Sequence, residues 1–127
     1  MGTGYKGGSQ IYRSIGQNIL PTSAKFHYLN GRFGVNSPHG DLSTRQIVSK
    51  DNLATAREFY DTIAYGGIEQ QHGSNMWITH MADGSIITMR LVSHSDGTPV
   101  VDINIRDSTH TGGVKNQKIH FVQRSDE

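Results

Sequence analysis

Polar and ionisable side chains occupy every second position in three apolar segments near the C-terminal end of the sequence. The segments are IITMRLV (86–92), VVDINI (100–105) and KIHFV (118–122). Their alternate positions hold Thr88, Arg90, Asp102, Asn104, Lys118 and His120. An imidazole moves protons near neutral pH, and fixed cations stabilise the charge that develops on phosphate oxygens. The pattern therefore indicates a site that cleaves a phosphodiester bond without a metal ion.

Each of these residue types suits one task in such a reaction. We expect His120 to act as the acid or base, and Arg90 and Lys118 to hold the phosphate, Arg90 through paired hydrogen bonds. Asp102 would orient His120 or Arg90. Ser93 and Ser95 would position the phosphate, although turn chemistry ahead of Asp96-Gly97 explains both serines equally well.

Thr88, Asn104 and His110 are expected to contact the substrate. His110 belongs to a glycine-rich loop just before the last apolar segment, from which it could reach a bound molecule. An ordinary solvated sheet face is the competing explanation for the whole set, with Asp102 paired to Arg90 or Lys118 across strands.

Composition limits the other kinds of chemistry. The 127 residues include no cysteine, which rules out a cysteine nucleophile and a cysteine-bound zinc ion. His72 and His80 have no carboxylate at a zinc-protease spacing, so we expect no metal site and no cofactor. No apolar run reaches the 18 residues that suggest a membrane span.

Charge is distributed unevenly along the chain. Residues 1–50 hold six basic side chains and one acidic one, whereas residues 51–83 hold five acidic side chains and one basic one. The basic part could meet phosphates, and the acidic segment is expected to lie away from the substrate.

Periodicity predicts helices first and strands afterwards. Helical spacing is present in residues 11–20, ending before Pro21, and in residues 51–65, with Asp51 as cap. In the second helix an apolar stripe is expected from Leu53, Ala56, Tyr60, Ile63 and Ala64. Strands are predicted at 75–81, 86–92, 100–105 and 118–122, with a short one near 26–28. This order indicates one α+β domain over 1–127, flexible at 1–10, with N-terminal helices on one face of a roughly four-stranded antiparallel sheet.

Residues 82–122 also carry a family resemblance. The segment MADGSIITMRLVSHSDGTPVVDINI, followed by a glycine-rich loop and KIHFV, resembles the C-terminal end of toxin domains from bacterial polymorphic and contact-dependent growth-inhibition systems. The preceding DNLATAREFYDTIAYGGIE is similar to the helix of these modules, which extends the resemblance to about residues 45–123. Such modules belong to a broad group that includes barnase, the EndoU nucleases, some colicins and RelE. The sequence departs from the EndoU pattern because it lacks a clear arrangement of two histidines and a lysine.

The resemblance implies a metal-independent endoribonuclease that cleaves RNA, most often transfer RNA. It implies a cognate immunity protein as partner, and for some members a translation factor such as elongation factor Tu. It also implies that the domain is part of a larger secreted or cell-surface effector and acts in the cytoplasm of the target bacterium. The motif positions that transfer are Arg90, Ser93, Ser95, Asp102, Lys118 and His120.

Two other functions fit the same sequence. The polar face could belong to a non-enzymatic module that binds RNA or protein, including an immunity partner. The second of these functions is a toxin that cuts DNA with the help of a metal ion, although the sequence offers no evident set of metal ligands.

Overall fold

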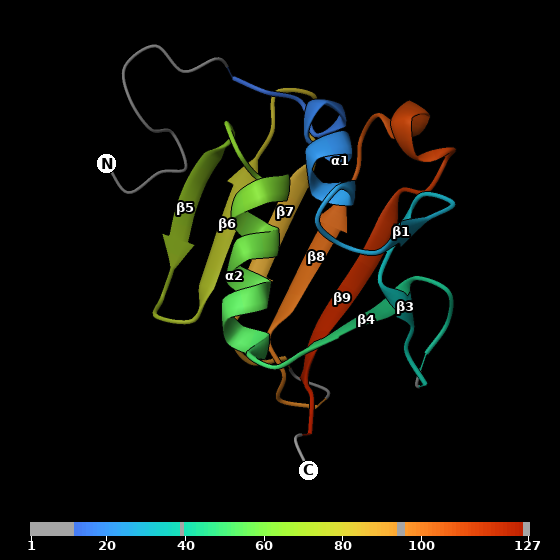
Figure 1. The fold of residues 1–127 in the computed structure, drawn as a ribbon. Coiled ribbons are helices and arrows are strands. Elements are labelled where there is room, and N and C mark those ends of the chain that lie inside the picture. The colour runs from blue at the N-terminus through green and yellow to red at the C-terminus, as the bar shows by residue number, and fades with distance from the viewer. Residues whose placement is uncertain (1–11, 39, 94–95, 126–127) are drawn as a thin grey trace.

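A mixed seven-stranded sheet carries two helices on one face in the computed structural model, which describes residues 12–38, 40–93 and 96–125 (Figure 1). The strands lie in the order β3-β4-β9-β8-β7-β6-β5. From one edge to the other their bounds are β3 (Val35–Asn36), β4 (Thr44–Ser49), β9 (Asn116–Gln123), β8 (Val100–Asn104), β7 (Ile86–Arg90), β6 (Met76–His80) and β5 (Ile68–His72). The other elements are the helices α1 (Gly16–Ser23) and α2 (Asn52–Ile63), the short 3-10 helix η1 (Ser108–Thr111), and a small hairpin of β1 (Tyr28–Leu29) and β2 (Arg32–Phe33).

The α+β class is confirmed, but the prediction of a four-stranded antiparallel sheet behind N-terminal helices is wrong. Strand β4 pairs with β9 in parallel, and β5 adds an antiparallel strand at the far edge. Helix α2 lies between β4 and β5 in the chain, after four of the strands. The predicted flexibility of residues 1–10 lies outside the described residues.

Helix α1 continues through the proline that was expected to end it. Pro21 lies inside the helix and has no N–H to donate to the carbonyl of Gln17. Nη2 of Arg13 donates to this carbonyl instead, at 2.9 Å. An arginine from the preceding segment thus replaces the missing backbone hydrogen bond. Ser9, a possible cap for this helix by its residue type, lies outside the described residues.

Helix α2 begins at the predicted cap and turns its apolar side toward the sheet. The carboxylate of Asp51 accepts a hydrogen bond from the N–H of Ala54 at 3.1 Å. The buried residues of the helix are Ala56, Phe59, Tyr60 and Ile63. Leu53 is 48% exposed, so its predicted place in the apolar stripe is wrong.

The core lies between the two helices and the inward side of the central strands. Ile87 and Met89 of β7, Val101 and Ile103 of β8, and Ile119 and Phe121 of β9 are at most 2% exposed, which confirms the expected alternation. Phe59 packs edge-on against Phe26 and Phe33 and contacts Phe121, with ring centroids 5.1 to 5.6 Å apart. The side chains between these core positions must therefore point to the opposite face.

Among the described residues, no helix has both the length and the apolar character that a membrane crossing requires.

Two substitutions in α2 test this packing. We expect Ile63→Ala to lower the free energy of unfolding by about 2–5 kcal/mol, because Ile63 is fully buried. Leu53→Ala, in the same helix, should cost about 0.5 kcal/mol or less because nearly half of that side chain is already in water. Urea unfolding of both variants measures the difference; equal losses would contradict the observed orientation of α2.

Candidate functional site

The polar side chains of β7, β8 and β9 share the sheet face that points away from α2, called here the open face. The strand register places Thr88, Asp102 and Lys118 in one row across the sheet. A neighbouring row contains Arg90, Val100 and His120 and continues to Gln46 of β4. Neighbouring strands are about 4.8 Å apart, so the backbones of Arg90 and His120 are separated by roughly 10 Å. The long side chains of Arg90 and Lys118 can bridge much of that distance.

Arg90 is held by an ion pair with Asp102. Its Nη2 donates to Oδ2 of Asp102 at 2.8 Å, and both side chains are partly exposed. Asp102 therefore orients Arg90, which is one of its two expected roles. The Nε of Arg90 is buried and has no hydrogen-bond partner in the described part of the chain. Lys118 lies opposite Asp102 in the register, so this part of the open face holds two basic side chains and one carboxylate.

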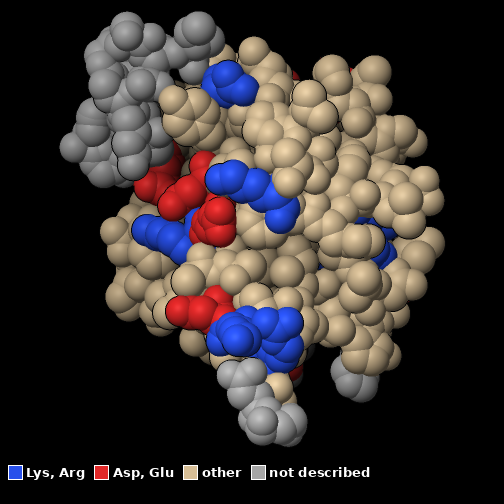
Figure 2. All heavy atoms as spheres, in the orientation of Figure 1, with Lys and Arg blue, Asp and Glu red and all other residues tan. Residues whose placement is uncertain are grey.

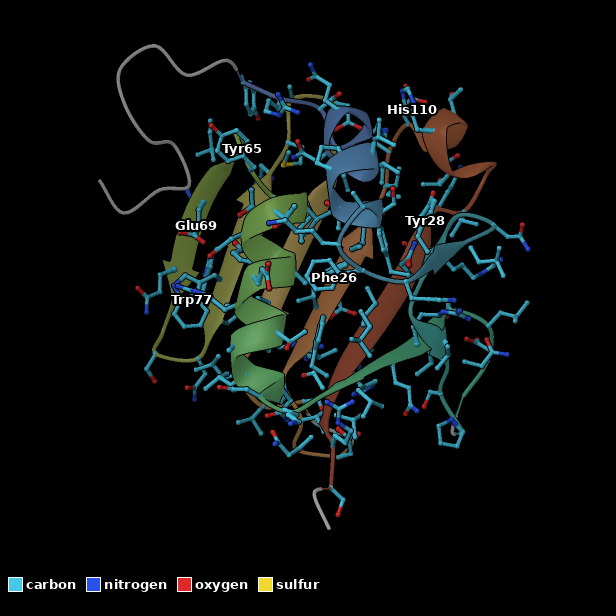
Figure 3. The ribbon with its side chains drawn as sticks, in the orientation of Figure 1. Phe26, Tyr28, Tyr65, Glu69, Trp77 and His110 are labelled. Atoms are coloured by element: carbon cyan, nitrogen blue, oxygen red, sulfur yellow. The ribbon has the colours of Figure 1, made fainter. Side chains whose placement is uncertain are left out.

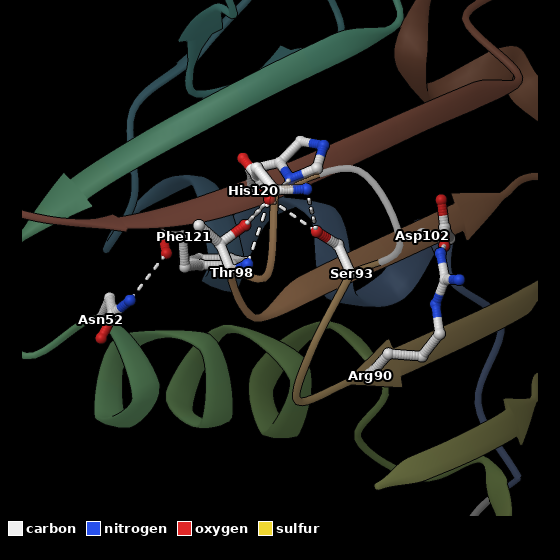
Figure 4. Close-up of polar contacts among 8 residues, drawn as sticks. Asn52, Arg90, Ser93, Thr98, Asp102, His120 and Phe121 are labelled. Carbon is white, nitrogen blue, oxygen red and sulfur yellow. Dashed lines mark hydrogen bonds and ion pairs between the residues drawn. The ribbon is translucent and has the colours of Figure 1, made fainter.

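His120 lies on the polar side of β9, as the alternation predicts, but it is nearly buried there. It is 5% exposed, and Thr98 and Asp96 lie against its ring (Figure 4). Its Nδ1 lies 3.0 Å from Oγ1 of Thr98 and 3.3 Å from Oδ1 of Asp96. The ring is consequently fixed from the Nδ1 side by the turn.

These contacts determine which ring nitrogen carries the proton in neutral His120. The hydroxyl of Thr98 donates to Oδ1 of Asp96 at 2.7 Å, so its oxygen can only accept from the ring. The proton therefore lies on Nδ1, and Nε2 keeps its lone pair. No side chain in the described residues forms a hydrogen bond with Nε2. An imidazole in this state is ready to accept a proton at Nε2.

Asp96 is the residue that sequence reasoning missed, since it was assigned only to a turn. Partial burial raises the pKa of Asp96, but hydrogen bonds from Ser93 and Thr98 outweigh this effect and lower the pKa to about 2. The carboxylate is therefore charged at neutral pH beside the N–H of His120. The sequence does contain a signal for this role of Asp96, because an aspartate in a turn often accepts hydrogen bonds from the residue two positions later. Here the N–H and the hydroxyl of Thr98 both donate to Asp96.

Ser93 performs turn chemistry in the structure. It is 4% exposed, and its hydroxyl donates to Oδ1 of Asp96 at 2.6 Å. Ser93 therefore positions Asp96. Because it is nearly buried, it has little exposed surface with which to contact a phosphate directly. Ser95 lies outside the described residues.

The two remaining substrate-contact candidates, Asn104 and His110, lie outside the row that contains Arg90 and His120. Asn104 is exposed on the open face, opposite Asn116 and one row beyond Asp102. His110 lies in η1 beside α1, and Figure 3 shows it at the end of the sheet, away from the polar rows. A methyl group on Gly16 would come 2.3 Å from Cδ2 of His110, so the imidazole packs directly on the start of α1. The structure does not bring His110 to the other candidates.

Acidic side chains gather on the helix side of the molecule. Figure 2 shows this face, where Glu58 and Asp61 of α2 are exposed and Glu69 of β5 is partly exposed. Glu69 is in register with Thr79 and Ile87, whose side chains point inward, which places it on the helix side as well. The acidic segment thus lies away from the open face.

In the described part of the chain, no group of three or more histidine, aspartate or glutamate side chains is placed to hold a metal ion. Comparisons of the chain with protein-family models, with curated proteins and with solved structures find no match.

The pKa of Asp96 predicts an acid-dependent contribution to stability. A carboxylate whose pKa is lower in the folded than in the unfolded chain stabilises the fold above about pH 4, and this contribution is lost as the pH falls toward 2. Because 49% of the side chain is exposed, we expect about 1 kcal/mol and not the full value of the shift. Urea unfolding of the parent and of Asp96→Asn at about pH 7 and pH 3 should show a difference that shrinks in acid. A difference that is constant with pH would mean that the Asp96 carboxylate is not stabilised by the turn.

Proposed function

We propose that the chain is a metal-independent endoribonuclease that acts as the toxin domain of a larger antibacterial effector. One observation carries the proposal: an imidazole fixed by a charged aspartate shares one sheet face with an arginine and a lysine. General acid–base chemistry at phosphorus needs a proton carrier and cations, and the open face supplies both.

In the proposed reaction the ribose 2′-oxygen attacks the neighbouring phosphorus. The bond from phosphorus to the 2′-oxygen forms and the bond to the 5′-oxygen breaks, which gives a 2′,3′-cyclic phosphate and a 5′-hydroxyl. Nε2 of His120 takes the proton of the 2′-hydroxyl or, when protonated, gives one to the departing 5′-oxygen. Arg90 and Lys118 hold the non-bridging oxygens as their negative charge increases.

The supporting residues act through these groups. Asp96 and Thr98 keep the Nδ1 proton in place, and their hydrogen bonds stabilise the imidazolium that forms when Nε2 accepts a proton. Asp102 holds the guanidinium of Arg90 over the sheet, and Ser93 holds Asp96. Substrate must approach Nε2 from the side away from Thr98 and Asp96, where Lys118 on the same strand and Gln46 on β4 are the neighbouring residues.

The family resemblance supports the biological setting of the proposal. Toxin domains of this group carry helices on one face of a small sheet and cleave RNA on the other, so we also propose a fold related to barnase, the EndoU nucleases, colicins and RelE. The expected substrate is transfer RNA, and the expected partner is an immunity protein; elongation factor Tu is a further candidate. The effector would be secreted or displayed at the cell surface and would act in the cytoplasm of the target cell.

A non-enzymatic RNA- or protein-binding module is the second candidate, and two observations favour it. Asp102 already neutralises Arg90, and His120 has little exposed surface. Such a face would bind a partner without turning it over.

Incubating the purified chain with total RNA in EDTA separates the candidates. Fragments with cyclic-phosphate ends are expected from the proposed enzyme. Intact RNA with retarded migration would identify a binding module, and cleavage of DNA only after a divalent metal is added would identify a DNase.

Replacing His120 tests the proton-transfer role. We expect His120→Ala to lower single-turnover cleavage by about 100-fold or more. The variant should also lose about 1–3 kcal/mol of stability because the buried hydrogen bonds to Thr98 and Asp96 disappear. Thr98→Val is the comparison variant, since it removes one hydrogen bond to Nδ1 but keeps the imidazole and its contact with Asp96, so it should lose clearly less activity than His120→Ala. Equal loss of cleavage in both variants would mean that the effect is structural.

Arg90 tests the role of the fixed cations. Arg90→Lys keeps the charge but loses the planar set of donors, so we expect a 100- to 1000-fold slower single-turnover rate, on the order typical for removal of one stabilising donor. Lys50 follows β4 and is exposed, and Lys50→Ala should weaken only salt-sensitive binding of RNA. Single-turnover cleavage at two salt concentrations measures both effects. If Arg90→Lys is as fast as the parent, Arg90 serves only its ion pair with Asp102.

A further inference from the structure

A second group of basic side chains surrounds a cavity at the edge of the sheet, called here the edge pocket. It lies where the β1–β2 hairpin meets β3 and β4 and has a volume of about 310 Å³. Its polar lining consists of His27, Asn30, Arg32, Asn36 and Arg45. None of the residues that line it is acidic. The pocket therefore combines two permanent positive charges with no neutralising carboxylate in its wall.

Arg45 forms the floor of the edge pocket and is 6% exposed. Its Nε donates to the carbonyl of Phe33 at 3.0 Å, and its Nη2 donates to the carbonyl of Gly34 at 2.9 Å. Nη1 donates to the side chain of Asn36 and to the carbonyl of Leu42. All of these acceptors are uncharged, so the guanidinium is fixed in place while its charge remains unpaired. An arginine buried this deeply usually has an anionic partner.

Arg32 adds a second charge that the described residues do not neutralise. Its Nε is buried without a hydrogen-bond partner, and no ion pair to Arg32 is formed within the described part of the chain. Burial and the neighbouring charge of Arg32 both lower the pKa of Arg45, which indicates that the two guanidinium groups repel each other. Within the described part of the chain Asp41 forms no ion pair with either arginine, and its carboxylate accepts from the N–H and hydroxyl of Ser43.

His27 lies on the wall of the same pocket with one nitrogen available. Its Nδ1 is 3.0 Å from the carbonyl of Gly34 and must donate to it, because a carbonyl oxygen only accepts. This leaves Nε2 free of that contact on an exposed side chain. Three apolar side chains complete the lining, and each is about half or more exposed: Leu29, Val35 and Leu42.

We infer that the edge pocket binds the phosphate group of a nucleotide. A phosphate supplies the negative charge that Arg32 and Arg45 lack, and guanidinium groups form strong charge-assisted hydrogen bonds with phosphate oxygens. The amides of Asn30 and Asn36 offer further polar contacts, and the exposed apolar side chains can pack against a base or ribose. Phosphate binding here goes beyond the proposed ribonuclease activity and does not depend on it.

The position of the pocket relates it to the open face. Val35 lines the pocket and is in register with Gln46, which is in turn in register with His120. Two strand spacings therefore separate Val35 from His120, or about 10 Å. If the proposed function holds, an RNA strand that crosses the open face at His120 reaches this edge of the sheet, and the pocket binds a phosphate of the same strand beyond the one being cleaved.

A titration followed by NMR tests the inference without any cleavage assay. Inorganic phosphate and adenosine 3′-monophosphate are added to the full chain at constant ionic strength set with chloride, and the backbone amide signals of Gly34 and Asn36 are followed. We expect saturable shifts in the parent and roughly tenfold weaker binding in Arg32→Gln, since that variant loses a charge-assisted contact. Arg106→Gln is the matched control, because Arg106 is exposed near Gly84, outside the residues that line the pocket.

The outcomes are distinct from those of the cleavage assay. Absence of saturable shifts in the parent, or equal binding by Arg32→Gln, would overturn the inference even if RNA is cleaved. Saturable binding by a chain that leaves RNA intact would uphold the pocket and defeat the proposed enzyme. If Arg32→Gln fails to fold by circular dichroism, His27→Ala replaces it; weaker binding in this variant supports the pocket, and parent-like binding contradicts it.

Discussion

The alternation of side chains along β9 is the constraint on which both faces of the molecule depend. Ile119 and Phe121 point inward and meet the aromatic packing around Phe59, so Lys118 and His120 must point outward. A shift of one residue in the register of β9 would exchange these pairs, burying a lysine and exposing a phenylalanine. The cost of that exchange makes the outward position of the polar side chains a consequence of core packing.

The same strand also positions the N-terminal elements. Gln117 lies on the inward side, where its side chain accepts from the N–H of Phe33 and donates to the carbonyl of Gly31. Asn52, at the start of α2, donates to the carbonyl of Phe121. The β1–β2 hairpin and α2 are therefore both attached to β9, so the strand that presents His120 on one side also carries the hairpin that forms the edge pocket.

Sequence reasoning was most successful where one side of a strand is apolar throughout. Residues 86–90 and 101–104 alternate, and their inward and outward sides follow from that pattern, whereas Val100 is buried on the outward side. Strand β4 gave no such signal, because Arg45 occupies an inward position and satisfies backbone carbonyls of the neighbouring loop. Strand β5 lies at the edge and has one apolar residue in five, Ile68. Pro21 was expected to end a helix and Asp96 only to form a turn. Both predictions missed a contact with a side chain elsewhere in the chain, Arg13 at the Gln17 carbonyl and His120 at the Asp96 carboxylate.

The distribution of counter-charges decides how each basic group interacts with an anion. Arg90 has Asp102 within 2.8 Å, so an anion must compete with a carboxylate for that guanidinium, whereas Lys118 lies opposite the same carboxylate in the register. Arg32 and Arg45 have no such competitor among the described residues, and their mutual repulsion adds to the attraction of an anion. On this argument the edge pocket attracts phosphate more strongly than the open face does.

The open face is better suited to act on a phosphate that is already held nearby, because His120 lies there with Nε2 as its acceptor and Asp96 fixing the other nitrogen. Such an arrangement binds the substrate mainly through a phosphate that does not react. The ground state of the reacting phosphate is then bound only weakly, so this binding does not raise the barrier to cleavage.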